Sequence, residues 1–208
     1  MHDPMAYKDD LARAYDSDVE RRGAVTPDTW RTDIVDRFAN DIRAVGARSV
    51  LELGCGTGQL ARHLADQDFD VTAIDLSVAN VEATQKRGIE AQVADFASLP
   101  FPDDSFDGAF AINSLLHVPP KELDGVFAEI ARVLHRSAPL LVVVWGGINQ
   151  QGPIEDEWLS PPRYFSTYTD KALLALSTPG FDFKTFEGLD VSEGSHDLHS
   201  QVLTLEAT

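Results

Sequence analysis

The sequence contains a single cysteine, Cys55, in 208 residues. One cysteine cannot form an internal disulfide, so the sequence gives no sign of a secreted scaffold built on disulfides. It also lacks an apolar run of the roughly 18 residues that a membrane span needs, because the longest run, around 139–145, has the length of a strand. The first ten residues lack the apolar core of a signal peptide. These absences predict a cytoplasmic protein without a membrane segment.

Basic residues are also scarce, with 17 Lys and Arg against 34 Asp and Glu and a formal net charge of −17. A field of that sign repels phosphate backbones, so nucleic acid is not an expected partner. Net charge informs association and solubility, but it says nothing about the fold.

Short apolar segments alternate with amphipathic ones along most of the chain. Such an alternation predicts crossover units and a mostly parallel sheet. The last two strands are joined without a helix, so they are expected to be antiparallel neighbours. The expected fold class is therefore α/β: a doubly wound, mostly parallel seven-stranded sheet with an antiparallel C-terminal strand and helices on both faces. Strands are expected at 48–53, 70–74, 91–94, 106–112, 140–145, 181–186 and 201–206, and helices at 59–67, 78–86, 122–134 and 170–177.

Both ends of the chain differ in composition from this alternating region. Residues 1–45 look helical and polar, and the stretch 29–45 places apolar side chains on one helical stripe that is expected to pack on the main body. This stripe comprises Trp30, Ile34, Phe38, Ile42 and Val45. Residues 146–169 are rich in Gly, Pro and aromatics and are expected to be irregular and functional. We predict one domain over 1–208, with a helical cap (1–45), a ligand-binding core (46–145) and an acceptor-side loop with a C-terminal hairpin (146–208).

The most informative segment is 50–60, which combines a strand, a glycine-rich turn and the start of a helix. Glycines allow positive φ and close approach of the backbone to a ligand, and a helix N-terminus favours a phosphate or a carboxylate. The spacing of Gly54, Gly56 and Gly58, preceded by Glu52, differs from the dinucleotide fingerprint, which needs a small residue where Gln59 stands. A phosphate-binding P-loop is excluded because no Gly-Lys-Ser/Thr occurs.

Two acids follow the next two predicted strands. Asp75 lies 21 residues after Gly54, near the spacing at which an acid meets ribose hydroxyls. Asp95 ends the third strand, where a carboxylate can accept from an adenine amine. The carboxyl ends of the strands are where open α/β sheets bind ligands, so the two acids favour an adenosyl ligand.

At this point the chain resembles the class I (Rossmann-like) S-adenosylmethionine-dependent methyltransferases of the small-molecule type. The resemblance rests on four successive motifs between residues 48 and 145, and more weakly on Pro179-Gly180-Phe181, which is similar to the Ala-Gly-Phe turn before the last hairpin of those proteins. The motifs are ELGCGTG at 52–58, IDLS at 74–77, ADF at 94–96 and FDGAFAINSLLH at 106–117. One departure is Arg-Ser-Ala-Pro at 136–139, where the family usually carries Lys-Pro-Gly-Gly.

The resemblance implies S-adenosyl-L-methionine as the cofactor. It implies that the glycines line the methionine part, that Asp75 holds the ribose, and that Asp95 meets the adenine. Cys55 lies within the loop, and its expected role there is packing. The implied cofactor-binding residues are Glu52, Gly54, Cys55, Gly56, Gly58, Asp75, Leu76, Asp95, Phe96 and Asn113.

His117 is the candidate catalytic residue, because it follows the fourth strand and histidine can take a proton near neutral pH. The alternative is cofactor shielding or packing, since a sulfonium is a good leaving group and orientation of the acceptor can suffice. His196 and His199, with Asp197 between them, are interpreted as exposed histidines of the tail. No metal is expected.

Aromatic side chains flank the 146–169 segment, and they either pack in the core or form the wall of an acceptor pocket. They are Trp145, Trp158, Tyr164, Phe165 and Tyr168. Tyr7 and Tyr15 of the N-terminal segment are expected to close the opposite side. The predicted substrate residues are Tyr15, Trp145, Tyr164 and Phe165.

These observations predict methyl transfer to a small-molecule acceptor by in-line displacement. The acceptor is not identified; the acidity and the aromatics favour a small neutral or cationic metabolite. One alternative is a regulatory module that binds the cofactor without catalysis. A nicotinamide-dependent oxidoreductase is a weaker alternative because of Gln59. The expected oligomeric state is a monomer or a homodimer.

Overall fold

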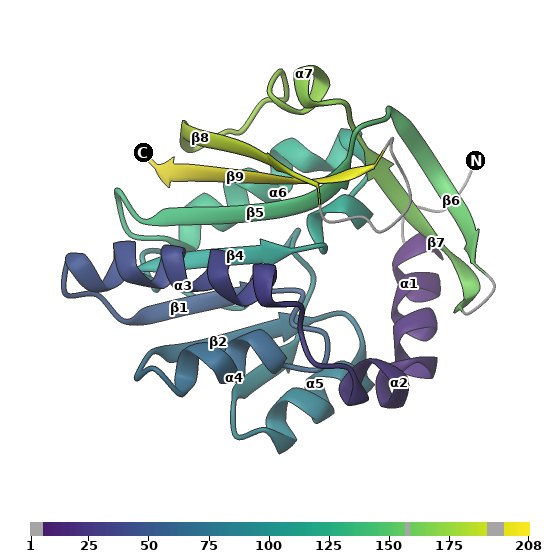
Figure 1. The fold of residues 1–208 in the computed structure, drawn as a ribbon, viewed down its shortest axis with the longest axis horizontal. Coiled ribbons are helices and arrows are strands. Elements are labelled where there is room, and N and C mark those ends of the chain that lie inside the picture. The colour runs from purple at the N-terminus through teal and green to yellow at the C-terminus, as the bar shows by residue number, and fades with distance from the viewer. Residues whose placement is uncertain (1–5, 157–158, 191–197) are drawn as a thin grey trace.

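The computed structural model describes residues 6–156, 159–190 and 198–208, which form a central sheet flanked by helices (Figure 1). Seven strands make the sheet in the order β3-β2-β1-β4-β5-β9-β8, and β6 and β7 form a separate two-stranded sheet. The strands are β1 (Ser49–Leu53), β2 (Asp70–Asp75), β3 (Glu90–Val93), β4 (Gly108–Ile112), β5 (Pro139–Gly146), β6 (Gln150–Asp156), β7 (Leu159–Thr167), β8 (Phe181–Leu189) and β9 (His199–Ala207). The helices are α1 (Ala6–Ser17), α2 (Val19–Ala24), α3 (Thr29–Ala44), α4 (Gln59–Ala65), α5 (Val78–Lys86), α6 (Pro120–Val133), α7 (Asp170–Leu173) and the 3-10 turn η1 (Leu115–His117).

The first five strands of the large sheet are parallel, and β9 runs antiparallel to both β5 and β8. Helices α4, α5 and α6 connect the parallel pairs β1–β2, β2–β3 and β4–β5. The order reverses between β1 and β4, so the loops after these strands diverge and leave a crevice at their carboxyl ends. The predicted fold class, with seven strands and an antiparallel C-terminal strand, is confirmed.

Two apolar layers cover the faces of the sheet. The amphipathic helix α6 buries Leu123, Phe127 and Ile130 on one face, in a cluster that includes strand residues of β1, β4, β5 and β9. Helices α3, α4 and α5 cover the other face, with Phe38 and Ile42 of α3 among the buried residues. The expected stripe on α3 is confirmed except at Val45, which lies just beyond the helix and is 78% exposed.

The segment 146–169 is not irregular, so that prediction is wrong. It forms the hairpin of β6 and β7, whose register runs from Gln150 opposite Thr167 to Asp156 opposite Leu159. Proline favours loops, and Pro153, Pro161 and Pro162 lie in these two strands. Each strand pairs on one side only, and proline is tolerated on edge strands. The helix expected over 170–177 is also shorter, because α7 ends at Leu173.

Helices α1 and α2 stand beyond the carboxyl ends of the central strands, with the β6–β7 hairpin beside α1 (Figure 1). The N-terminal segment is therefore placed across the crevice instead of on a face of the sheet. None of the helices among the described residues is long and apolar enough to cross a membrane.

Candidate functional site

Two adjoining cavities lie at the carboxyl ends of the central strands, under α1 and α2. Their volumes are about 230 and 80 Å³, and both are lined by Arg22, Gly54, Gly56 and Ile112. The larger also contains Glu52 and is called the loop cavity below. The smaller is called the strand-tip cavity. The four shared residues make the two cavities parts of one continuous site.

The three glycines after β1 differ in how closely other atoms surround them. A Cβ on Gly54 would lie 2.4 Å from Ser114 Cβ, and one on Gly58 would lie 2.6 Å from Thr84 Oγ1, so both positions are closed by packing. A Cβ on Gly56 would meet no atom within 4 Å, which leaves the loop open towards the cavities. All three have positive φ, of 79°, 52° and 75°. Gly54 and Gly56 line the cavities, whereas Gly58 lines neither and begins α4.

Asp75, the last residue of β2, ties the first two strand-tip loops together. Its carboxylate accepts hydrogen bonds from the backbone N–H of Gly56 at 2.8 Å and of Ser77 at 2.9 Å. The side chain is buried, and burial raises the pKa of this carboxyl, while the two backbone N–H bonds oppose the rise. The Asn80 side chain also hydrogen-bonds this carboxylate, which retains acceptor capacity for a ligand hydroxyl. Asp75 and Leu76 lie in the wall of the strand-tip cavity, as expected for a ribose and adenine contact.

Glu52 has an unsatisfied carboxylate oxygen within the described part of the structure. The residue is buried, and its Oε2 atom has no hydrogen-bond partner. Burial, and secondarily the charge of Asp75, raises the pKa of Glu52 well above the ordinary glutamate value. Burying an unpaired carboxylate is costly, so the site is set up for a cationic partner.

Arg31 of α3 lines the same loop cavity as Glu52. Its side chain is 27% exposed, and its Nε forms an ion pair with Asp28 Oδ2 at 3.3 Å. Burial lowers the pKa of this guanidinium. A carboxyl and a guanidinium in one cavity match the ammonium and carboxylate of an amino acid. The motif analysis missed Arg31, because no motif marks it and its position depends on how α3 packs.

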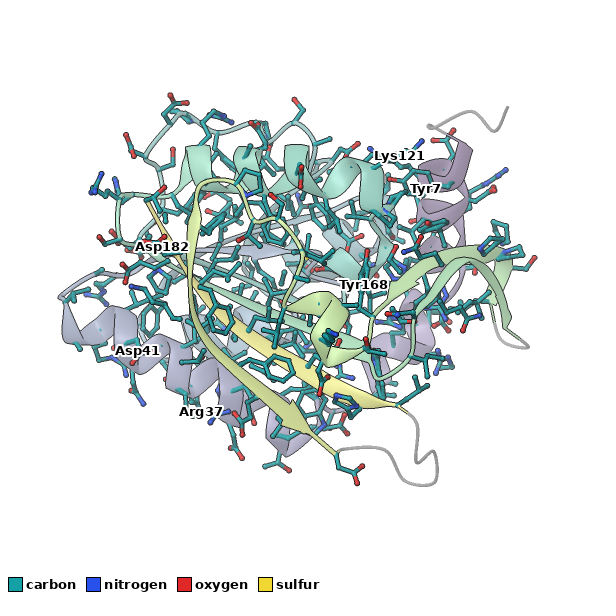
Figure 2. All side chains as sticks on the ribbon, turned by 90° about the horizontal axis from the view of Figure 1, so that it is seen from above. Tyr7, Arg37, Asp41, Lys121, Tyr168 and Asp182 are labelled. Carbon is teal, nitrogen blue, oxygen red and sulfur yellow. The ribbon has the colours of Figure 1, made fainter. Side chains whose placement is uncertain are left out.

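The strand-tip cavity is closed by α1 through charged contacts. Lys8 Nζ lies 2.7 Å from Asp95 Oδ2 and 3.5 Å from Glu122 Oε2. The Tyr7 hydroxyl donates to Glu122 at 2.8 Å, which brings the N-terminal end of α1 beside the start of α6 (Figure 2). Asp95 and Phe96 line this cavity as expected, but Lys8 occupies one carboxylate oxygen of Asp95.

The C-terminal end of α1 is held separately. Asp16 accepts from the Ser77 hydroxyl at 2.6 Å and from the Ala79 backbone N–H at 3.0 Å. Helix α1 is therefore fastened to the loops after β2 and β3 and to α6, so it roofs the strand-tip cavity.

His117 lies buried in η1, with both ring nitrogens occupied. Its Nδ1 is 2.7 Å from the Tyr164 carbonyl oxygen, so Nδ1 carries the proton and Nε2 accepts from the Tyr15 hydroxyl at 2.7 Å. Burial lowers the pKa of His117 to about 3. The imidazole is thus neutral, and its Nε2 lone pair already accepts a hydrogen bond from the Tyr15 hydroxyl. The general-base role stays a prediction, and this geometry favours a role for His117 in positioning Tyr15.

The predicted acceptor residues divide into two groups. Tyr15 and Phe165 surround His117, with ring centres 5.6 and 4.7 Å from the imidazole, and Tyr164 binds it through its carbonyl. Trp145 packs against the main core cluster and lines neither cavity. Tyr168 is also buried in that cluster, whereas Trp158 lies outside the described residues.

Two further loop residues, Asn113 and Cys55, differ in their contacts at the site. Asn113 lines the strand-tip cavity with φ of 54°, and its buried Oδ1 has no partner in the described structure. Cys55 Sγ lies 3.3 Å from Thr84 Oγ1, and burial raises the pKa of the thiol, so its contacts are those of a packing residue although it borders the loop cavity.

The tail histidines form no metal cluster in the part that the structure covers. His199 Nε2 lies 2.7 Å from Asp170, and no group of three or more His, Cys, Asp or Glu side chains gathers among residues 6–156, 159–190 and 198–208. His196 and Asp197 lie outside these ranges.

The fold and the site define a class I methyltransferase fold, whose cradle consists of the loops after β1, β2, β3 and β4. Residues 50–137 match a family model described as a methyltransferase domain. This match, and curated relatives that are named as methyltransferases, agree with the resemblance that the sequence motifs indicate.

Three similar proteins illustrate the match. An O-methyltransferase of Penicillium expansum is 38% identical over 102 residues, which are 45% of this chain and 36% of the relative. Another O-methyltransferase, from Aspergillus nomiae, is 32% identical over 62% of this chain and 59% of its own length. A Burkholderia thailandensis 1,6-didemethyltoxoflavin N1-methyltransferase, solved with its acceptor and S-adenosylhomocysteine, has a TM-score of 0.72 at 19% identity and covers 100% of this chain and 92% of its own. The chain spans about a third to three fifths of the two curated relatives.

Proposed function

We propose that the protein transfers a methyl group from S-adenosylmethionine to a small-molecule acceptor. The observation that carries this proposal is the unsatisfied Oε2 of Glu52, buried beside the open Gly56 in a methyltransferase domain. The ammonium of an amino-acid cofactor would satisfy that oxygen. When bound, the cofactor supplies an activated methyl group on sulfur.

The residues present fit such a cofactor along its whole length. Glu52 would accept from the ammonium, Arg31 would donate to the carboxylate, and Asp75 would accept from the ribose hydroxyls. Asp95 would receive the adenine amine once Lys8 turns aside, with Leu76 and Phe96 packing on the ring. Asn113 offers its backbone near the reacting centre.

Neutral His117 has a positioning role in this proposal. It accepts a hydrogen bond from the Tyr15 hydroxyl and so fixes the direction of the lone pairs on the Tyr15 oxygen. Orientation of the acceptor and exclusion of water are contributions that this buried arrangement can make to an in-line displacement.

The cofactor proposal is tested by calorimetry with S-adenosylhomocysteine. We expect measurable binding that Asp75→Ala weakens at least tenfold, because a ribose partner and the tie to Gly56 are both lost. Asp70→Ala, at the exposed start of the same strand, is the matched control and should bind like the wild type. No heat at millimolar ligand from the folded wild type would contradict the proposal.

Two alternatives are separated by further assays. A cofactor-binding module without catalysis would bind S-adenosylhomocysteine but transfer no label from radiolabelled S-adenosylmethionine to a metabolite extract. A nicotinamide oxidoreductase would enhance NADH fluorescence, which the methyltransferase would leave unchanged.

We also propose that the protein works in the cytoplasm as a monomer or homodimer and forms one functional domain. Fractionation and light scattering of the native protein check these points. A membrane-bound fraction or a higher oligomer would contradict them.

A further inference from the structure

Positive charge gathers beside Tyr15, in a protein whose net charge is −17. Arg22 of α2 lines both cavities, and Arg163 of β7 donates from Nη1 to the Tyr15 hydroxyl at 3.0 Å. The Cζ atoms of Arg22 and Arg163 lie 4.9 and 5.5 Å from the centre of the Tyr15 ring. Two guanidinium groups therefore lie against one tyrosine, which lines the strand-tip cavity.

Arg22 has no anionic partner in the part of the chain that the structure describes. Its guanidinium makes no hydrogen bond and no ion pair there, and it lies over the Tyr15 ring. The neighbouring Arg21, in contrast, is paired with Asp18 at 2.5 Å. A half-buried cation without a counter-ion is costly, and a bound anion would offset that cost.

The carboxylates near Arg22 are already engaged. Asp75 interacts with Arg22 electrostatically, but each of its oxygens accepts from a backbone N–H. Asp16 accepts from Ser77, and Asp95 is paired with Lys8. In the described structure none of the three forms an ion pair with Arg22.

His117 does not supply a negative charge either. It is neutral because burial lowers its pKa to about 3, and both Arg163 and Arg22 further disfavour its protonation. Both guanidinium groups therefore act electrostatically on the buried imidazole beside Tyr15.

We propose that the methyl acceptor is a small organic anion, whose carboxylate or phenolate oxygen is held by Arg22 and Arg163 beside Tyr15. Guanidinium groups suit this task because their planar forks bind such oxygens in pairs. The proposal rests on the methyltransferase function and narrows its substrate class. It departs from the neutral or cationic acceptor expected from composition, because net charge does not report which side chains reach the site.

Three probes of one shape and different charge test the proposal: benzoate, benzamide and benzamidine. Each is titrated into protein saturated with S-adenosylhomocysteine, which occupies the loop cavity and Arg31, and binding is followed by NMR. We expect benzoate to bind about tenfold more tightly than benzamide, and benzamidine not to bind. Arg22→Gln and Arg163→Gln should abolish the preference, whereas Arg22→Lys should keep part of it.

The matched control is Arg13→Gln, which removes the same charge from an exposed position of α1 paired only with Asp10. It should retain the full preference for benzoate. Circular dichroism establishes that each variant is folded before titration.

Several outcomes overturn the proposal. They are undetectable benzoate binding at millimolar concentration, equal binding of the three probes, a preference that survives both glutamine variants, and a loss of S-adenosylhomocysteine affinity in Arg22→Gln with the benzoate preference intact. Failure of wild-type S-adenosylhomocysteine to bind would instead contradict the cofactor proposal.

A fourth probe distinguishes the two kinds of anion. 4-Nitrophenol is titrated above and below its own pKa against the same saturated protein. If the phenolate binds more tightly than the neutral phenol, the site accepts phenolates. If only benzoate is preferred over its neutral analogue, the site accepts carboxylates.

Discussion

At the residue scale, Glu52 is the group whose environment fits the apo protein least well. Its carboxyl is buried without a partner for Oε2, next to the charge of Asp75. Such strain at a site is expected where a ligand supplies the missing partner. Stability and binding should therefore respond oppositely to the loss of this charge.

Glu52→Gln should stabilise the apo protein and weaken S-adenosylhomocysteine binding. Because the folded-state pKa of Glu52 is raised, the folded protein holds a proton that the unfolded chain releases above about pH 4.3. Wild-type stability is therefore lost as pH rises from there through the folded pKa. Scanning calorimetry should show a Tm advantage of the variant of roughly 2–4 °C per ~1 kcal/mol of relief, growing with pH. An advantage that shrinks with rising pH would contradict this.

The same raised pKa predicts proton release when the ligand binds. An ammonium beside Glu52 favours the carboxylate, so protons should leave as S-adenosylhomocysteine binds below the folded pKa. Calorimetry in buffers of different ionisation enthalpy measures this release. It should disappear in Glu52→Gln; an equal release in the variant would show that another group is responsible.

Tyr15 and His117 should be energetically coupled. Tyr15→Phe leaves the buried Nε2 of His117 without a donor, which costs about 1–3 kcal/mol. A double-mutant cycle with His117→Gln, followed by denaturant unfolding, should give a coupling of about 0.5–3 kcal/mol. Tyr7→Phe is the matched comparison on the same helix, and it should cost less because its partner Glu122 is partly exposed. Strictly additive effects would contradict the proposed contact.

Residues next to a motif could be predicted from the sequence, whereas those brought in by packing could not. Asp75, Asp95 and Gly56 follow strands directly, so strand order alone places them at one edge. Arg22 of α2 and Arg31 near the start of α3 line the loop cavity because of how these helices pack on the rest of the chain. No local pattern in the chain encodes that packing. Trp145 could not be placed from the sequence either, because its position near the end of a buried run did not reveal that its side chain packs against the main core cluster.

At the element scale, α1 controls access to the strand-tip cavity. It is held at one end by Lys8 and Tyr7 and at the other by Asp16. These contacts are partly exposed, so opening of α1 should cost less than global unfolding. The adenine amine would compete with Lys8 for Asp95, which makes opening a step in binding.

Hydrogen exchange should detect this opening. With S-adenosylhomocysteine at saturation, we expect the amides of α1 to exchange about tenfold or more slowly than in the free protein. Amides of β8, on the far edge of the sheet, serve as the internal control and should not change. Uniform slowing of both segments would indicate global stabilisation and contradict a local opening of α1.

The helices and strands of the core could be predicted because their signals are local. The helix expected over 78–86 matches α5, and each expected strand of the large sheet is present. The β6–β7 hairpin was missed because its prolines and its half-buried strands give neither a strand period nor a recognised turn. Its role in placing Arg163 and the Tyr164 carbonyl was therefore missed as well.

At the scale of the whole molecule, the net charge does not reveal the basic side chains that lie at the site. The net charge is −17, yet Lys8, Arg22, Arg31 and Arg163 gather around the crevice under α1. Composition argued against a phosphate-backbone partner, but it could not locate this cluster. The fold class followed from the alternation of strands and helices, whereas the acceptor depends on tertiary contacts.

The central claim is that four consecutive strand tips hold an adenosyl amino acid. A crystal structure with S-adenosylhomocysteine tests it most directly. The account predicts the ammonium at Glu52, the carboxylate at Arg31, the ribose hydroxyls at Asp75, and the adenine between Leu76 and Phe96 with Lys8 displaced from Asp95. Crystals soaked at saturating ligand that show this crevice empty, or the ligand bound elsewhere, would contradict it.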